Sequence, residues 1–161
     1  LRAPGLVASS MLAAGALLWW ADRQARDGRE GRDIGRPYAD VGLADGLLIG
    51  AAQALAIIPG VSRSGITISV GLLRGLSREA AVRFSFLLAT PIVAGAGMMK
   101  FKSIIHSGHD SLVLVGILTS LIVGLAAIKL LLKISQISTF MPFVWYRVVL
   151  GSGSLLKVWL G

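Results

Sequence analysis

An arginine lies inside one of the most apolar stretches of this chain. Arg63 follows Pro59-Gly60 and stands between the apolar runs 51–58 and 66–73. An arginine at the centre of a bilayer costs about 3 kcal/mol on insertion scales, so it marks a functional-site hypothesis by default. Proline followed by glycine also interrupts a helix. The segment is therefore expected to fold as two short helices around a polar break.

The composition is that of an integral membrane protein. Hydrophobic residues make up 55% of the 161 residues and charged residues 15%, against about 25% charged residues in soluble domains. The net charge of +8 would suggest a nucleic-acid partner in a soluble protein. Here the basic residues mostly flank apolar segments, as the positive-inside rule describes, and no basic face interleaved with aromatic side chains is present. We therefore expect a membrane protein and no nucleic-acid partner.

Four apolar segments are predicted to be transmembrane helices. Spanning a bilayer takes about 20 apolar residues; segments 80–99, 112–132 and 140–160 reach this length, and 5–20 is slightly short. Residues 21–41 are rich in glycine and charge, which predicts a solvated loop. Because the chain starts at Leu1 without the features of a signal peptide, we expect residues 1–161 to be one all-α membrane domain belonging to a longer protein.

Segment 42–74 is too long for one helix, yet each of its two pieces is too short to span. Pieces 45–58 and 64–73 would reach only about 15–21 Å at 1.5 Å per residue. A re-entrant helix-break-helix hairpin fits these lengths and places 10 Lys and Arg residues on one face and 4 on the other, whereas a crossing segment gives 8 and 6. The positive-inside rule therefore favours re-entry, with the loop 21–41 in the cytoplasm.

The polar residues at the break are suited to phosphate. Arg63 offers a planar fork of donors, the start of the second half-helix offers unpaired N–H groups and the positive end of its dipole, and Gly60 and Gly65 permit close backbone approach. The hydroxyl groups belong to Ser62, Ser64 and Thr67. Alternatively, Ser62 only caps the helix, Thr67 bonds back to the preceding turn and Arg63 snorkels. An anion channel or carrier would use these residues nearly as well as an enzyme.

Four stretches carry a resemblance to a known family. They are 53–67 (QALAIIPGVSRSGIT), 75–81 (GLSREAA), 84–91 (FSFLLATP) and 141–147 (MPFVWYR). Together, in this order and spacing, they resemble the undecaprenyl-diphosphate phosphatases, also called bacitracin-resistance proteins, and 53–67 resembles the second signature of that family.

The resemblance implies a function and a fold. It implies hydrolysis of undecaprenyl diphosphate to undecaprenyl phosphate and phosphate, which recycles the carrier lipid of cell-wall synthesis in the bacterial inner membrane. The site would open to the extracytoplasmic side of a multi-pass protein, and this chain would be the second half of an inverted-repeat fold. Arg63 would clamp the diphosphate, Ser62 and Thr67 would bind its oxygens, and Ser64 would support them. A divalent cation, Mg²⁺ or Ca²⁺, is expected as cofactor.

The chain also departs from this family. The glutamate-rich first signature has no counterpart, and apart from the acids of the 22–40 loop the chain has only Asp45, Glu79 and Asp110. Phosphoryl transfer needs a positioned nucleophile or water. We therefore expect a clamp that is inactive without the N-terminal half of the protein, and we leave a homodimer open. A polyprenyl-phosphate carrier or flippase that uses the same anion site without cleavage is the alternative.

Several further residues carry weaker expectations. Arg147 reaches either a phosphate or, by snorkelling, the membrane surface. Gln53 stands where the inverted-repeat picture would place a glutamate of the first signature, so it faces the cavity or bonds another helix. Glu79 and Arg83 are predicted to form an i,i+4 ion pair. The glycines at 95, 97, 116 and 124 predict close helix packing. The segment 106–110 contains metal-ligand residue types but no fourth ligand, so no metal site is assigned there.

Overall fold

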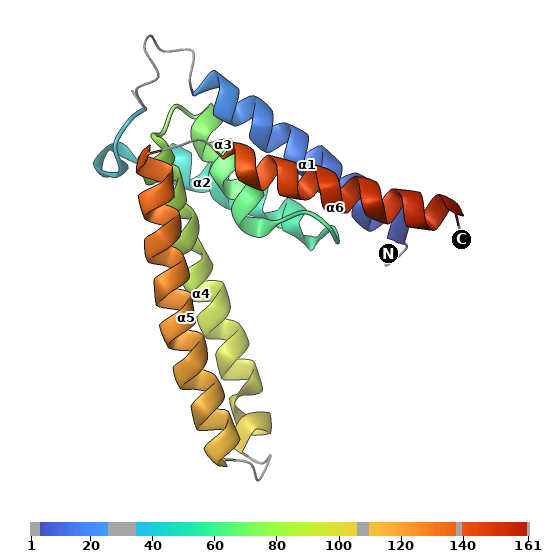
Figure 1. Ribbon diagram of the computed structural model, residues 1–161. Coiled ribbons are helices and arrows are strands. Elements are labelled where there is room, and N and C mark those ends of the chain that lie inside the picture. The colour runs from blue at the N-terminus through green and yellow to red at the C-terminus, as the bar shows by residue number, and fades with distance from the viewer. Residues whose placement is uncertain (1–3, 26–34, 106–109, 138–139, 161) are drawn as a thin grey trace.

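The computed structural model describes residues 4–25, 35–105, 110–137 and 140–160, and within these ranges the regular structure is helical. The order of elements is α1 (Pro4–Gln24), η1 (Tyr38–Asp40), α2 (Leu43–Gln53), η2 (Ala54–Ile57), α3 (Arg63–Leu73), α4 (Arg78–Ile105), α5 (Asp110–Ile137) and α6 (Met141–Leu160). Helices α1 and α6 lie side by side, α4 and α5 form a long hairpin that projects away from them, and α2 and α3 lie where the two pairs meet (Figure 1).

Three helices are long and apolar enough to cross a membrane. They are Pro4–Gln24 in α1, Arg78–Lys100 in α4 and Ser111–Ser135 in α5. Helix α6 forms where the fourth spanning helix was predicted, but it falls outside this group because Arg147, Lys157 and the Gly-Ser-Gly-Ser run at 151–154 lower its hydropathy. The all-helical, membrane-compatible architecture predicted from composition is therefore confirmed.

The predicted interruption between the two half-helices is present. Helix α2 tightens into the 3-10 turn η2, the chain leaves helical geometry at Ile58, and α3 starts at Arg63. Gly60 adopts a φ of 95°, a left-handed value that favours glycine. The backbone stays hydrogen-bonded through the turn, since Val61 N–H donates to the Ile58 carbonyl at 3.1 Å.

The start of α2 and the end of α3 are tied together by one carboxylate. Asp45 Oδ1 accepts from Arg74 Nε at 2.9 Å, and Oδ2 accepts from Arg36 Nη2 at 3.0 Å. The hydrogen bond from Arg74 is the main cause that lowers the pKa of Asp45; those from Arg36 and the Gly42 N–H act the same way, while desolvation opposes them. A lowered pKa means that this tie is complete above the ordinary pKa of aspartate and is lost only as the pH falls below it.

A buried ion pair joins α1 to α4. Arg78 Nε donates to Asp22 Oδ1 at 2.7 Å, and the two side chains are 6% and 3% exposed. Asp22 lies inside α1, which is helical to Gln24, so the solvated loop predicted to start at 21 starts later. The rest of that loop, 26–34, lies outside the described residues. Apolar residues of α1, α2, α3, α4 and α6 form one hydrophobic core, which includes Leu18, Ile49 and Leu72.

The glycine packing predicted in the α4–α5 hairpin is wrong for the part of the chain described. A Cβ built at Gly95, Gly97, Gly116 or Gly124 would have no atom within 4 Å. Gly97 and Gly116 are exposed and Gly95 and Gly124 are half-buried, and most of the large apolar side chains of α5 are exposed. The i,i+4 ion pair predicted between Glu79 and Arg83 is confirmed, with Arg83 Nη2 at 2.6 Å from Glu79 Oε1.

Asp22→Ala should strongly destabilise the protein, by about 3–5 kcal/mol, because a buried guanidinium would lose its carboxylate. Glu79→Ala is the control, since its ion pair with Arg83 is partly exposed and such pairs contribute about 0–1 kcal/mol. Thermal unfolding in detergent measures both. Equal shifts in the two variants would contradict a special role for the α1–α4 pair.

Candidate anion-binding site

The first turn of α3 is capped but leaves two backbone donors available. Ser62 is the N-cap residue, and its Oγ accepts from the Gly65 N–H at 3.2 Å. The first intrahelical bond runs from the Ile66 N–H to the Ser62 carbonyl at 2.9 Å. The N–H groups of Arg63 and Ser64 therefore have no acceptor within the helix. Unpaired N–H groups at a helix N-terminus form a site for an anion.

The Arg147 side chain passes from α6 across α1 to this turn. Its Cβ lies 3.5 Å from the point where a side chain would begin at Gly15. Its Nη2 lies 2.4 Å from the corresponding point at Gly65, in the first turn of α3. Its Nη1 is buried, and no described group accepts a hydrogen bond from it. The guanidinium of Arg147 therefore lies against α3, and a contact between Arg147 and a phosphate stays a prediction.

Arg63 and Arg147 differ from the other described arginines. Four arginines form ion pairs: Arg36 and Arg74 with Asp45, Arg78 with Asp22, and Arg83 with Glu79. Arg23 stacks over the Trp19 ring at 5.4 Å. Arg63 and Arg147 have no carboxylate partner among the described residues. One is the first residue of α3 and the other packs against its third, so two uncompensated guanidinium groups belong to one helix turn.

Gly60 and Gly65 both lie close to other parts of the protein and not beside open space. A Cβ at Gly60 would meet the Val7 carbonyl and Ser10 Oγ, each 2.3 Å away. The Ser10 hydroxyl also donates to the Pro59 carbonyl. The break is thus docked on the first half of α1. Gly65 faces the Arg147 guanidinium, as described above. Whether either glycine also touches a substrate stays a prediction.

Thr67 lies deeper in α3 than the other hydroxyl residues. It is 1% exposed, and its Oγ1 lies 3.0 Å from the Arg63 carbonyl oxygen and 2.7 Å from Ser85 Oγ on α4. Ser62 and Ser64 are closer to the surface, with their hydroxyl oxygens 3.3 Å apart. A direct contact between Thr67 and a phosphate stays a prediction.

Gln53 is the last residue of α2. Its Oε1 is buried and has no hydrogen-bond partner in the described part of the chain. An unpaired buried amide oxygen is unfavourable, so it is an acceptor available to a donor outside these residues. This agrees with both alternatives for Gln53, a cavity-facing group and a group that bonds another helix.

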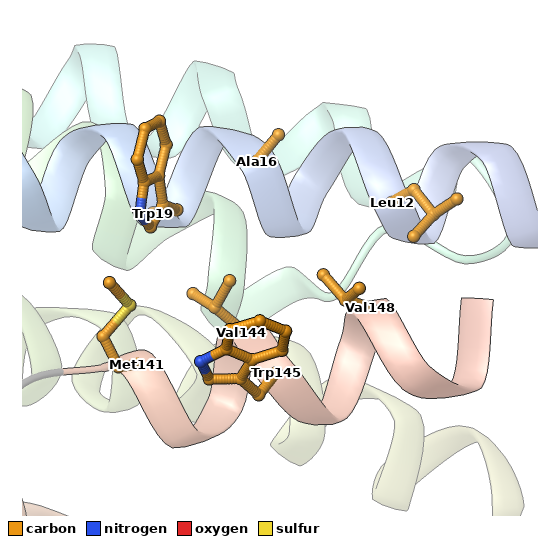
Figure 2. A pocket seen from close by; sticks show the side chains of 7 residues that line it. All are labelled: Leu12, Ala16, Trp19, Met141, Val144, Trp145 and Val148. Carbon is orange, nitrogen blue, oxygen red and sulfur yellow. The ribbon is translucent and has the colours of Figure 1, made fainter. Parts of the chain in front are cut away.

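A groove near these helices has an apolar lining without charged side chains. It has a volume of about 480 Å³ and lies between α1 and α6. Figure 2 shows its lining, in which Trp19 from α1 and Trp145 from α6 stand on opposite walls. Arg147 is not part of this lining, although Val144 and Val148 on the same helix are. The groove therefore lies beside the anion site and is separate from it.

Three described carboxylates form ion pairs away from the break. Asp22, Asp45 and Glu79 each bind an arginine. No group of three or more His, Asp or Glu that could hold a metal ion exists among the described residues. Most of the segment 106–110 falls outside those residues. The described side chains therefore do not fit a metal site of their own, and no chemical step is derived through a metal.

Comparisons with known proteins bear on the four stretches quoted above. The family described as "Bacitracin resistance protein BacA" matches residues 1–153. The chain belongs to the bacitracin-resistance family. A Moorella thermoacetica protein named undecaprenyl-diphosphatase is 43% identical over 159 residues, which cover 99% of this chain and 58% of that protein. A Pelotomaculum thermopropionicum protein of the same name is 45% identical over 150 residues, 93% of this chain and 54% of that protein. The chain thus spans little more than half the length of these relatives.

Three residues of the candidate site were missed by sequence reasoning. Ser10 binds the backbone of the break, Gly15 makes room for the Arg147 stem, and Ser85 binds Thr67. Ser85 falls in a stretch that carried the family resemblance, which was the one available signal. Ser10 and Gly15 lie in an ordinary apolar helix, where nothing local marks them.

Gly65→Ala should displace Arg147 and weaken anion binding, because the new methyl group would start 2.4 Å from Nη2 and 2.9 Å from Cζ of that side chain. Gly153→Ala in α6 is the control, since a Cβ there meets nothing within 4 Å. Binding of pyrophosphate to the detergent-solubilised full-length protein, followed by thermal shift, measures the effect. Unchanged binding in Gly65→Ala would show that the position of Arg147 is irrelevant.

Proposed function

We propose that the full-length protein hydrolyses undecaprenyl diphosphate to undecaprenyl phosphate and phosphate, and that this chain supplies the phosphate clamp. The single observation that carries the proposal is the pair of arginines without carboxylates, Arg63 and Arg147, at a helix turn with two unpaired N–H groups. A diphosphate supplies the negative charge and the acceptor oxygens that this turn lacks. The names of the relatives support the choice of a polyprenyl diphosphate.

The roles follow from position. Arg63 binds the terminal phosphoryl group through its fork of donors, together with the N–H groups of Arg63 and Ser64. Ser62 and Ser64 hold the turn and offer hydroxyl donors. Arg147 completes the charge from the α6 side, and Gln53 offers an acceptor to a protonated oxygen or water. A divalent cation belongs to the proposal only through the family resemblance, and its protein ligands would come from residues beyond those described.

The membrane placement is also part of the proposal. Segment 42–74 is re-entrant, α1, α4, α5 and α6 span the bilayer, and loop 21–41 is cytoplasmic in a bacterial inner-membrane protein. The tie of Asp45 to Arg36 and Arg74 supports re-entry, because it brings the beginning of α2 and the end of α3 to one place. The site opens to the extracytoplasmic side at depth, where the lipid diphosphate reaches it. A homodimer stays open.

This chain by itself is proposed to bind and not to cleave. Asp22, Asp45 and Glu79 are neutralised by arginines, and Asp40 lies in η1 beside Arg36, at the base of the α2–α3 hairpin, so no described carboxylate is placed to activate water at the turn. The attacking group would come from the part of the relatives that this chain does not cover. Purified chain that released phosphate from farnesyl diphosphate at a normal rate would contradict this division of labour.

A polyprenyl-phosphate carrier is the second candidate function. It is favoured because no attacking group is found among the described residues at the turn. A polyprenyl-phosphate flippase would need the clamp and nothing else. The two functions separate in proteoliposomes made with full-length protein and a labelled lipid diphosphate. Release of inorganic phosphate supports the phosphatase, whereas transfer of uncleaved lipid between leaflets supports the carrier.

Arg63→Ala in the full-length protein should reduce kcat/KM on the order of a hundredfold or more, since truncating one partner of a buried charge pair costs about 2–5 kcal/mol. Arg63→Lys should be nearly as inactive, because an ammonium group does not reproduce the bidentate fork. Arg83→Ala, which removes an exposed ion pair, is the matched control. Normal activity in either Arg63 variant would refute the clamp.

Arg147→Met should lower activity while leaving thermal stability equal or higher. A buried guanidinium without a partner is unfavourable for folding, and an apolar side chain of similar volume removes that cost. Lys157→Met on the same helix, at an exposed position, is the control. If Arg147 were retained for stability, its replacement would instead lower the melting temperature.

A further inference from the structure

One hydrogen bond connects the proposed clamp to α4. Thr67 Oγ1 and Ser85 Oγ are 2.7 Å apart, and the two residues are 1% and 4% exposed. Thr67 lies one turn after the start of α3, and Ser85 lies two turns into α4. Apart from this bond, the hydrogen bonds of Thr67 stay within its own helix.

The hydroxyl proton of Thr67 is used in hydrogen bonds inside the protein. A threonine hydroxyl has one proton. Its oxygen lies 3.0 Å from the Arg63 carbonyl oxygen and 3.2 Å from that of Ser64, both of which can only accept. Either the proton goes to these carbonyls and Ser85 donates to Thr67, or the proton goes to Ser85. In both arrangements the proton is already used, so no donor remains for a phosphate oxygen.

The hydrogen bonds of Thr67 instead support the turn that carries the proposed clamp. The two carbonyls belong to Arg63 and Ser64, the residues whose N–H groups and side chains form the proposed clamp. Thr67 holds that turn from inside α3, and Ser85 anchors Thr67 to α4. The Asp45 tie acts at the opposite end of α3, through Arg74.

We propose that Ser85 is a positioning residue for the clamp, acting through Thr67, and that Thr67 orients the first turn of α3 without touching the substrate. This inference rests on the proposed function for its kinetic readout. It assigns a role to Ser85 and changes the role of Thr67 from a phosphate ligand to a support.

A double-mutant cycle in the full-length membrane protein tests the proposal. The variants are Thr67→Val, Ser85→Ala and the double variant, with phosphate release from farnesyl diphosphate measured per amount of monodisperse protein. Both single variants should lose a similar share of kcat/KM, on the order of tenfold, and the double variant should lose no more than the worse single one. Thr67→Ser, which keeps the hydroxyl, should retain most activity.

A direct contact between Thr67 and phosphate would give a different pattern of losses. If Thr67 binds phosphate directly, Thr67→Val will lose far more activity than Ser85→Ala, and the two losses will multiply in the double variant. Either result overturns the proposal. Ser69→Ala is the matched control, because the Ser69 hydroxyl is buried in the same helix and donates to the Gly65 carbonyl at 2.7 Å without linking α3 to α4. A loss in Ser69→Ala equal to that in Ser85→Ala would mean general loosening of α3 and would also overturn it.

A failure of the proposed function can be distinguished from a failure of the Thr67–Ser85 proposal. If the wild-type protein releases no phosphate, the phosphatase proposal fails, and the same cycle is then measured as the pyrophosphate concentration that gives a half-maximal thermal shift. Non-additive, similar losses in affinity would still support the Thr67–Ser85 link. Additive losses would overturn it.

Discussion

A guanidinium group in apolar surroundings needs a negative partner. Some of the described arginines have a carboxylate partner and others do not. Arg36 and Arg74 share Asp45 at the base of the α2–α3 hairpin, and Arg78 is buried with Asp22 between α1 and α4. These pairs build the scaffold. Arg147 is half-buried, and its buried Nη1 has no hydrogen-bond partner among the described residues. The scaffold thus holds an uncompensated positive charge at the first turn of α3, where an anionic ligand would stabilise it.

The second constraint is the backbone of the break. Polar backbone at membrane depth is tolerated only where it is buried in protein or lines a cavity. Here the break is covered on one side by α1, through Ser10 and the close fit of Gly60. Its other side, the start of α3, keeps two N–H groups for a ligand. Under the proposed function, a single turn therefore combines a structural contact with a binding surface.

Much of this could be predicted from the sequence. The lengths of the apolar segments predicted the helices, and Pro59-Gly60 predicted the interruption. The run from Gln53 to Thr67 indicated the bacitracin-resistance family, which matches residues 1–153 of this chain. The Glu79–Arg83 pair followed from its i,i+4 spacing. Each of these depends on residues close together in the chain. The errors concern distant contacts: the glycines of α4 and α5 have no close packing partner among the described residues, and α1 extends beyond Trp20, where Asp22 pairs with Arg78, 56 positions away.

The sequence by itself determined that the chain is a helical membrane protein with an arginine-bearing break suited to phosphate. Local spacing, hydropathy and turn chemistry suffice for that, because they act within a few residues. Only the tertiary structure decided that Arg147 turns inward to Gly65, that Ser10 and Gly15 of α1 shape the site, and that Thr67 bonds Ser85. These residues come from three other helices, and their meeting depends on how the helices pack.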